Sequence, residues 1–218
     1  MNEFHNCVEN NFVPFNNNKV QTLQELSYSY HIDAEKFADW IYNNVSKPLG
    51  VKEIISTIVD VNLDQNGIPS VILENGETHY SDYWLDCSGF KKYNHIKTNK
   101  AVVMPIGYSD SSENKVYTRT IRNDYGWQFK ISLKDRQGTG IIFSDEYFNS
   151  EEVQQFLLQK ENNHLATPKV LKWTPGRMNK PGVKNVYSIG LAAGFVEPME
   201  ANALAATVSN IKAASRSI

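Results

Sequence analysis

The residues with the clearest chemical potential lie near the C-terminus, where a hydrophobic strand runs into a glycine-rich turn and then an Ala-rich segment. The turn reads Gly190-Leu-Ala-Ala-Gly-Phe-Val-Glu-Pro-Met-Glu200, and Pro198 is suited to the first turn of a helix. Small residues let a backbone approach a ligand closely, and a helix start offers N–H groups to an anion or an electron-rich ring edge. The same pattern is typical of a strand–turn–helix connection that only packs tightly, so the residues alone leave both interpretations open.

Other residues with chemical potential have simpler interpretations. His31 stands where a strand is expected to meet a helix, which favours a structural hydrogen bond over a role as a base. The remaining histidines are scattered and indicate no metal site. Cys87 is expected to be a small buried apolar residue. Trp127 and Phe129 are two residues apart, so a strand would place them on one face, where pattern alone favours a core position.

Composition excludes several classes of protein. The 218 residues carry 22 Lys and Arg against 24 Asp and Glu, a balance that argues against a nucleic-acid binder. No apolar run approaches the roughly 20 residues needed to span a bilayer, and the Asn-rich N-terminus does not resemble a signal peptide. Two distant cysteines indicate neither a disulfide framework nor a zinc site, so we expect a reduced, cytoplasmic setting.

The elements that must position these residues begin with a helix. Asp33 can cap it, and Phe37, Trp40, Ile41 and Val45 recur at helical spacing up to Gly50. The β-branched stretch Lys52–Leu63 predicts a strand, followed by a turn at 65–67, a short strand over 70–73 and a hairpin signal at 75–76. Residues 83–87 then predict a short buried strand.

The middle of the chain predicts an antiparallel layer. Four strand-like runs separated by turn residues lie between Ala101 and Phe143, and Ser150 is placed to cap a short helix after them. Strands are expected over 170–173 and 186–189, and a final helix from about Glu197. We therefore expect a mixed α/β (α+β) fold, with an irregular segment over 1–26 and one domain over 27–218 whose antiparallel layer spans about 101–145.

Four blocks of sequence, taken in order, resemble the flavin-dependent tryptophan halogenases, a branch of the FAD-dependent monooxygenases. The blocks are Tyr30-His-Ile-Asp-Ala34, Leu85-Asp-Cys-Ser-Gly-Phe-Lys91, Gly126-Trp-Gln-Phe-Lys-Ile-Ser132 and the turn Gly190–Glu200. Phe143-Ser-Asp-Glu146 is similar to the family segment that follows the third block. The resemblance covers roughly Ser27 to the C-terminus, and four ordered blocks are far more specific than any single one.

The resemblance implies an FAD-dependent monooxygenase-like fold in which a mixed sheet with helices lies beside an antiparallel layer on the substrate side. It implies an enzyme that uses reduced FAD, oxygen and a halide ion to halogenate an aromatic substrate of tryptophan or indole type. A separate flavin reductase would supply the reduced FAD. In the family, the oxidised halide crosses a tunnel to a lysine beside the substrate.

The resemblance also assigns roles to single positions. Glu200 matches the glutamate that positions the halogenating species or stabilises the cationic intermediate, and a carboxylate suits positive charge that develops on an aromatic ring. The backbone N–H groups of Asn202 and Ala203 match the positions that hold halide. Trp127 and Phe129 match positions on the substrate and tunnel side. The cofactor-binding positions of the family fall on Ile54, Gly190, Leu191 and Leu204.

The departures from the family pattern concern the cofactor and the halide. None of the twelve glycines falls in a G-x-G-x-x-G spacing, and Lys19 is the only lysine before Tyr30. The family places its dinucleotide fingerprint and its catalytic lysine ahead of the first block, so we expect a partial chain that lacks this part and the C-terminal helical region. Ala201-Asn202-Ala203 replaces Ser-Thr-Gly at the halide loop, which removes a glycine's freedom to adopt positive φ.

Three interpretations remain open from the sequence. The chain is part of a halogenase or related monooxygenase, a non-catalytic remnant of one, or one piece of a split enzyme that is completed by another polypeptide. An unpaired sheet edge left by the missing N-terminal strand would favour a homo-oligomer or a complementing polypeptide. An in-frame G-x-G-x-x-G and lysine block upstream of Met1 in the gene would favour the first interpretation.

Overall fold

The computed structural model describes residues 15–16, 19–22, 30–88, 97–195 and 203–216. The chain forms two compact units, one from Met1–Val51 with Lys100–Leu171 and the other from Lys52–Asn99 with Lys172–Ile218. Helices and several separate sheets alternate along the chain, which confirms the predicted mixed architecture. Within the described ranges, no helix is both long and apolar enough to span a bilayer.

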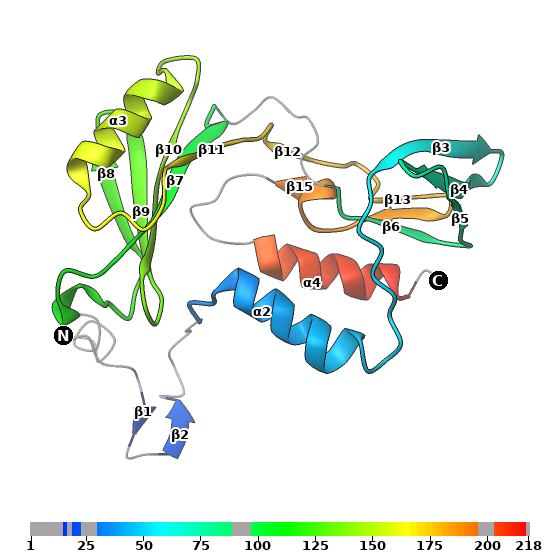
Figure 1. Ribbon diagram of the computed structural model, residues 1–218, viewed down its shortest axis with the longest axis horizontal. Helices are drawn as coiled ribbons and strands as arrows, with labels where there is room; N and C mark the ends of the chain where they lie inside the picture. The colour runs from blue at the N-terminus through cyan, green and yellow to red at the C-terminus, as the bar shows by residue number, and fades with distance from the viewer. Residues whose placement is uncertain (1–14, 17–18, 23–29, 89–96, 196–202, 217–218) are drawn as a thin grey trace. The chain divides into compact units, whose positions relative to one another are not determined.

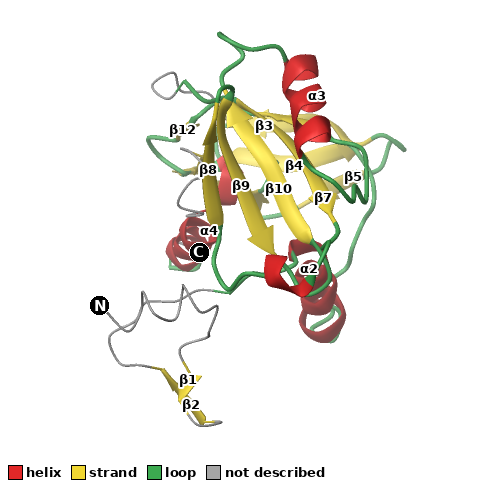
Figure 2. Cartoon of the chain, turned by 90° about the vertical axis from the view of Figure 1, so that its left-hand side faces the viewer, coloured by secondary structure: helices red, strands yellow, loops and turns green. Residues whose placement is uncertain are grey.

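The first unit is built on a five-stranded sheet with the order β11-β7-β10-β9-β8. The strands are β7 (Lys100–Ile106), β8 (Arg119–Asn123), β9 (Gly126–Ser132), β10 (Gln137–Phe143) and β11 (Lys169–Lys172). Strand β10 pairs antiparallel with β7 and β9, and β9 pairs antiparallel with β8. These pairings confirm the predicted antiparallel layer. Figure 2 shows its strands β8, β9, β10 and β7 side by side.

One face of this sheet is covered by helix α3 (Ser150–Lys160) and carries the core of the unit. Val153 and Leu157 of α3 pack on Val102, Met104, Ile106, Ile141 and Phe143 of the sheet. The predicted cap at Ser150 is wrong by one residue. The N-cap is Asn149, whose Oδ1 accepts a hydrogen bond from the N–H of Glu151 at 2.9 Å, so Ser150 is already helical.

Helix α2 (Ala34–Ile41) begins where the sequence predicts. Asp33 is its N-cap, and a π-helical turn (η1, Tyr42–Ser46) extends it toward Gly50, which has φ +81°. Two short strands, β1 (Phe15–Asn16) and β2 (Lys19–Thr22), pair antiparallel earlier in the chain. A 3-10 turn (η2, Ser111–Glu113) precedes β8.

In the second unit, an antiparallel meander joins β3 (Ile58–Asp64), β4 (Gly67–Leu73) and β5 (Thr78–Tyr80). The predicted turns at 65–67 and 75–76 connect these strands. The strand predicted over Lys52–Leu63 is wrong in its first half, because β3 pairs only with β4. Ile58 already lies opposite Leu73, the last residue of β4, so residues 52–57 have no strand beside them.

A second sheet of this unit has the order β13-β14-β6 and leads into the glycine turn. Its strands are β6 (Trp84–Asp86), β13 (Gly182–Val183) and β14 (Val186–Ser188), and β6 pairs parallel with β14. The prediction that β6 is buried is wrong, because β6 is an edge strand and Leu85 is 54% exposed. Cys87, predicted to be buried, is exposed as well.

Of the remaining elements of the second unit, one strand precedes β13 along the chain and the others follow β14 (Figure 1). They are β12 (Gly176–Arg177), the 3-10 turn η3 (Gly190–Ala192), β15 (Gly194–Phe195) and helix α4 (Ala203–Ala214). Strand β12 pairs antiparallel with β15, and α4 contacts η3. The predicted helix start near Glu197 lies outside the described residues.

Candidate active-site groove and glycine turn

Strand β9 presents different chemistry on its two faces. The rings of Trp127 and Phe129 lie on the same face, with centroids 6.4 Å apart and an edge-on arrangement. Gln128 between them points to the opposite face and is fully buried. The period-two expectation for the aromatic pair is therefore confirmed, while its role on the substrate side stays a prediction.

The ring of Phe129 lies over a glycine on the neighbouring strand. Gly140 of β10 is paired with Phe129, and a Cβ at Gly140 would come within 2.9 Å of Phe129 Cε1 and 2.7 Å of Val103 Cγ1. Real Cβ atoms do not approach that closely, so any side chain at this position would displace its neighbours. Gly140 thereby allows Phe129 and Val103 to close over β10.

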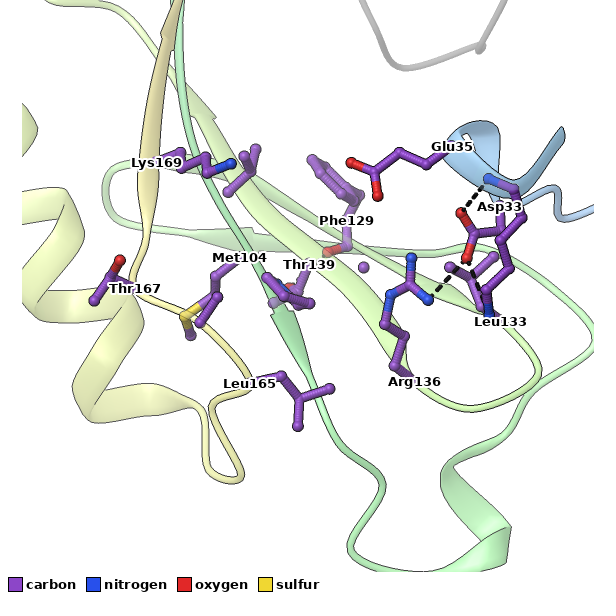
Figure 3. A pocket seen from close by; sticks show the side chains of 15 residues that line it. Asp33, Glu35, Met104, Phe129, Leu133, Arg136, Thr139, Leu165, Thr167 and Lys169 are labelled. Atoms are coloured by element: carbon purple, nitrogen blue, oxygen red, sulfur yellow. Dashed lines mark hydrogen bonds and ion pairs between the residues drawn. The ribbon is translucent and has the colours of Figure 1, made fainter. Parts of the chain in front are cut away.

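Phe129 lines a groove of about 540 Å³ that lies entirely within the first unit (Figure 3). This volume falls within the usual range of small-molecule sites. The apolar side chains that line the groove are Val103, Met104, Pro105, Phe129, Leu133, Leu165 and Ala166. The charged side chains around them are Asp33, Glu35, Lys36, Arg136 and Lys169. The groove thus combines an apolar surface with groups of both charges, as a small polar aromatic ligand would require.

Ion pairs at one end of the groove connect the start of α2 to the hairpin between β9 and β10. Arg136 Nη1 lies 2.8 Å from Asp33 Oδ2, and Lys36 Nζ lies 3.1 Å from Asp135 Oδ2. The hydrogen bond from Arg136 lowers the pKa of Asp33, and the hydrogen bond from Lys36 lowers the pKa of Asp135. Both carboxylates are therefore ionised at neutral pH and already paired, which makes this network structural.

Two other charged side chains of the groove do not take part in these ion pairs. Glu35 of α2 and Lys169 of β11 form no ion pair or side-chain hydrogen bond with any of the residues that the structure describes. Figure 3 shows the Glu35 carboxylate extending from α2 over the groove, with Lys169 on the strand at its other side. A carboxylate and an ammonium group beside an apolar surface complement a zwitterion with an aromatic part. Sequence reasoning missed both residues because neither belongs to a recognisable motif.

His31 has the structural role that the sequence predicts. Its Nδ1 lies 2.8 Å from the carbonyl oxygen of Ser132, and its Nε2 lies 3.2 Å from Thr118 Oγ1. Because a carbonyl can only accept, Nδ1 carries the proton, and in the neutral ring Nε2 accepts from the threonine hydroxyl. Both ring nitrogens are thus engaged, and His31 holds the entry to α2 against the end of β9.

The glycine turn of the second unit is fixed by buried small residues and one left-handed glycine. Gly190 has φ +62°, and a Cβ there would lie 3.2 Å from Thr207 Oγ1 of α4. Ser188, Ile189 and Ala192 before and within the turn are buried, and the Ile189 N–H donates to the carbonyl of Asp86 at 2.9 Å. The absence of a side chain at Gly190 lets η3 pack directly on α4.

The sequence-predicted cofactor and halide positions fall on different parts of this unit. Gly190 and Leu191 lie in η3, while Ala203 and Leu204 open α4, which contacts η3. Leu204 is 63% exposed. Ile54 lies in the irregular segment before β3 and is 55% exposed. Glu200 and Asn202 lie outside the described residues, so their predicted roles are untested.

Comparison with known proteins gives one consistent family. The model of the tryptophan halogenase family matches residues 3–217. Tryptophan 7-halogenase KtzQ of Kutzneria sp. (strain 744) is 29% identical over 196 residues, which cover 82% of this chain and 37% of KtzQ. Tryptophan 7-halogenase RebH of Lentzea aerocolonigenes is 28% identical over a similar share of both chains, 82% and 37%.

Solved structures agree with this match. Xcc4156, a flavin-dependent halogenase from Xanthomonas campestris, aligns with a TM-score of 0.83 at 25% identity over 95% of this chain and 44% of its own. BrvH, a flavin-dependent halogenase from Brevundimonas sp. BAL3, aligns with a TM-score of 0.76 at 25% identity over 84% of this chain and 40% of its own. The chain thus spans about 37% of the length of the curated relatives it matches. Since the family pattern runs through nearly all of its residues, the protein belongs to the tryptophan halogenase family.

Proposed function

We propose that this chain forms part of a flavin-dependent halogenase that uses a halide ion to modify an aromatic substrate of tryptophan or indole type. The observation that carries the proposal is the family match over residues 3–217, which includes both the groove and the glycine turn. A flavin reductase as partner and a cytoplasmic location belong to the same proposal. The chain spans about 37% of the length of its curated relatives, so the proposal concerns the share of their reaction that these residues would carry.

FAD fits the described residues in part. Leu204 is largely exposed and Leu191 is half-buried beside the glycine turn, so both can offer apolar contacts to a planar ring. The pyrophosphate would need the N–H donors of a glycine fingerprint, which the sequence lacks. We therefore assign only flavin contacts at Gly190, Leu191 and Leu204, and an adenine-side contact at Ile54, to this chain. Bound reduced FAD would supply the oxygen chemistry.

The chain's own residues would bind and orient the substrate. Phe129 and Val103 provide an apolar surface that excludes water from an aromatic ring, and Trp127 belongs to the same face. Glu35 and Lys169 can pair with the ammonium and carboxylate groups of an amino acid. By family resemblance, Glu200 would stabilise positive charge on the reacting ring, and the N–H groups of Asn202 and Ala203 would hold the halide.

Cofactor binding gives the first test. We expect the 218-residue chain to bind FAD weakly, because a doubly charged pyrophosphate would lack its backbone donors. Titration of FAD against the purified protein, followed by flavin fluorescence, measures the dissociation constant. A sub-micromolar value would show that other residues hold the pyrophosphate.

Halogenation itself gives the second test. The chain is joined to the N-terminal and C-terminal segments of a relative and assayed with reductase, FAD, bromide and tryptophan or indole, with mass spectrometry of the product. Glu200→Gln should lower turnover by about 10²-fold or more, whereas Glu197→Gln serves as the matched control. Equal, small losses for both variants would contradict the role of Glu200.

The halide loop, in which Ala201-Asn202-Ala203 replaces the family's Ser-Thr-Gly, favours a second candidate function, that of a non-catalytic remnant or one piece of a split monooxygenase. A remnant would give no brominated product even in the joined protein. A split enzyme would give product when a separate polypeptide with the N-terminal segment is added, and the two chains would co-elute in size-exclusion chromatography. A homo-oligomer without added polypeptide would instead appear as a concentration-dependent elution volume.

A further inference from the structure

A buried polar network lies on the face of β9 opposite to Trp127 and Phe129, and it includes Thr139 of β10, which also lines the groove. Gln128 is fully buried, and its Nε2 donates to Glu161 Oε1 at 2.6 Å and to Thr139 Oγ1 at 2.9 Å. Lys130 Nζ lies 2.5 Å from Glu161 Oε2. Glu161 is the C-cap residue that follows α3 and is only 5% exposed. One carboxylate therefore binds two successive inward side chains of β9.

The network continues to the backbone of a groove residue. Thr139 of β10 is 1% exposed, and its hydroxyl donates to the carbonyl oxygen of Phe129 at 2.8 Å. The path from Glu161 through Gln128 and Thr139 thus ends at Phe129, whose ring already lies over Gly140 on the other face. His164 also helps to fix the backbone of Glu161, because its Nε2 donates to the carbonyl oxygen of Glu161 at 2.7 Å.

Stability alone does not account for such an arrangement. Charges removed from water lose hydration, and a buried ion pair commonly contributes no more stability than apolar side chains of similar volume. The neighbouring core between α3 and the sheet consists of aliphatic and aromatic side chains, so apolar residues could also have filled the positions of this network. Directional hydrogen bonds do something that apolar contacts do not: they fix the strand that makes them in one position.

We propose that Glu161 is a positioning residue that fixes, through Gln128, Lys130 and Thr139, the place of Trp127 and Phe129 on the groove side of β9. Its relevance to substrate rests on the proposed function, whereas the positioning itself does not. The network acts on alternate residues of one strand, so an inward shift of Gln128 or Lys130 moves the outward aromatic rings. Loss of the network should therefore alter the rings before it unfolds the protein.

The test uses the 218-residue protein labelled with fluorotryptophan and observed by fluorine NMR. The resonance of Trp127 is assigned by its loss in Trp127→Phe, and the other three tryptophans serve as internal references.

Thr139→Val removes the hydroxyl at nearly constant volume, and Thr139→Ser restores it. Glu161→Gln removes the charge, and Glu161→Gln with Lys130→Met removes both charges in case the single variant fails to fold. Val153→Ala is the matched control, because it weakens the core without touching the network.

We expect Thr139→Val and the Glu161 variants to shift, split or broaden the Trp127 resonance by more than its linewidth well below the melting temperature. Thr139→Ser should keep the original resonance, and Val153→Ala should lower the melting temperature while leaving the resonance in place. An unchanged Trp127 resonance in Thr139→Val would overturn the proposal and leave the network a stabilising one. No FAD or substrate is present, so a failed halogenation assay contradicts the proposed function without affecting this result.

Discussion

The sheet of the first unit and the glycine turn of the second reach their structures by different means. Ile141, Phe143 and Leu157 of the sheet and α3 are at most 1% exposed, so side-chain packing specifies that region. Around the turn, most of the buried residues are small, namely Ser188, Ala192 and Ala193, while Leu204 of α4 stays exposed. The first region is thus held by its side chains. The second depends on one backbone conformation and on close approach.

The largest effect should come from the packed region. Leu157→Ala removes a fully buried side chain from the core and should lower the free energy of unfolding by about 2–5 kcal/mol. Leu204→Ala, at a position 63% exposed, should change it by no more than about 0.5 kcal/mol. Equilibrium urea denaturation measures both values. Similar losses in the two variants would contradict the contrast between the regions.

A smaller effect should come from the glycine beneath Phe129. Gly140→Ala would place a Cβ 2.7 Å from Val103 Cγ1 and 2.8 Å from the carbonyl oxygen of Val102, and should cost about 1–3 kcal/mol. Gly138, two residues earlier on the same strand, has nothing within 4 Å of an added Cβ. Gly138→Ala is therefore the control, with stability unchanged or raised by up to about 1 kcal/mol. Equal losses would mean that strand glycines, and not this close contact, decide stability.

Gly190→Ala tests the region that depends on backbone conformation. The φ of +62° disfavours any residue with a Cβ, and the cost should be about 1–2 kcal/mol. Repeating the substitution in a Thr207→Ala background separates the two causes. A cost that persists there reflects the left-handed backbone, whereas a cost that disappears reflects the contact with Thr207 Oγ1 at 3.2 Å. Full stability of the single variant would show that the turn rearranges.

Much of the fold could be predicted from sequence because local patterns carry it. Asp33, as a capping residue, predicts the start of α2, and turn residues separate the strands of the antiparallel layer. Strand β3 was predicted too long because its length is set by the partner strand β4, which the residues of 52–57 do not reveal. The exposure of β6 and Cys87 depends likewise on which strand occupies an edge.

The site was predictable only where a motif marks it. Period-two alternation places Trp127 and Phe129 together, and the resemblance points to the glycine turn. The same alternation sends Gln128 and Lys130 to the other face, but nothing in the sequence names Glu161, more than thirty residues later, as their partner. Glu35 and Lys169 were missed for the same reason, since the groove joins a helix and a strand that are distant in the chain.

The smallest effect should appear in acid, at the ion pair between Asp33 and Arg136. Because Arg136 lowers the pKa of Asp33 below its ordinary 3.8, the unfolded chain binds the proton more readily than the folded one. The stabilisation is therefore fully present above about pH 4 and is lost as the pH falls through the lowered pKa of the folded state. Asp33→Asn keeps a capping side chain but removes the charge, so its melting temperature should lie below that of the unmodified protein at neutral pH and meet it in strong acid.

Arg136→Gln should give the same pH dependence of the melting temperature, and the double variant should lower the melting temperature little further. High salt should shrink the difference in melting temperature, because the ion pair is near the surface. A difference between Asp33→Asn and the unmodified protein that stays constant down to the acid limit would assign the effect to the helix cap and not to the ion pair.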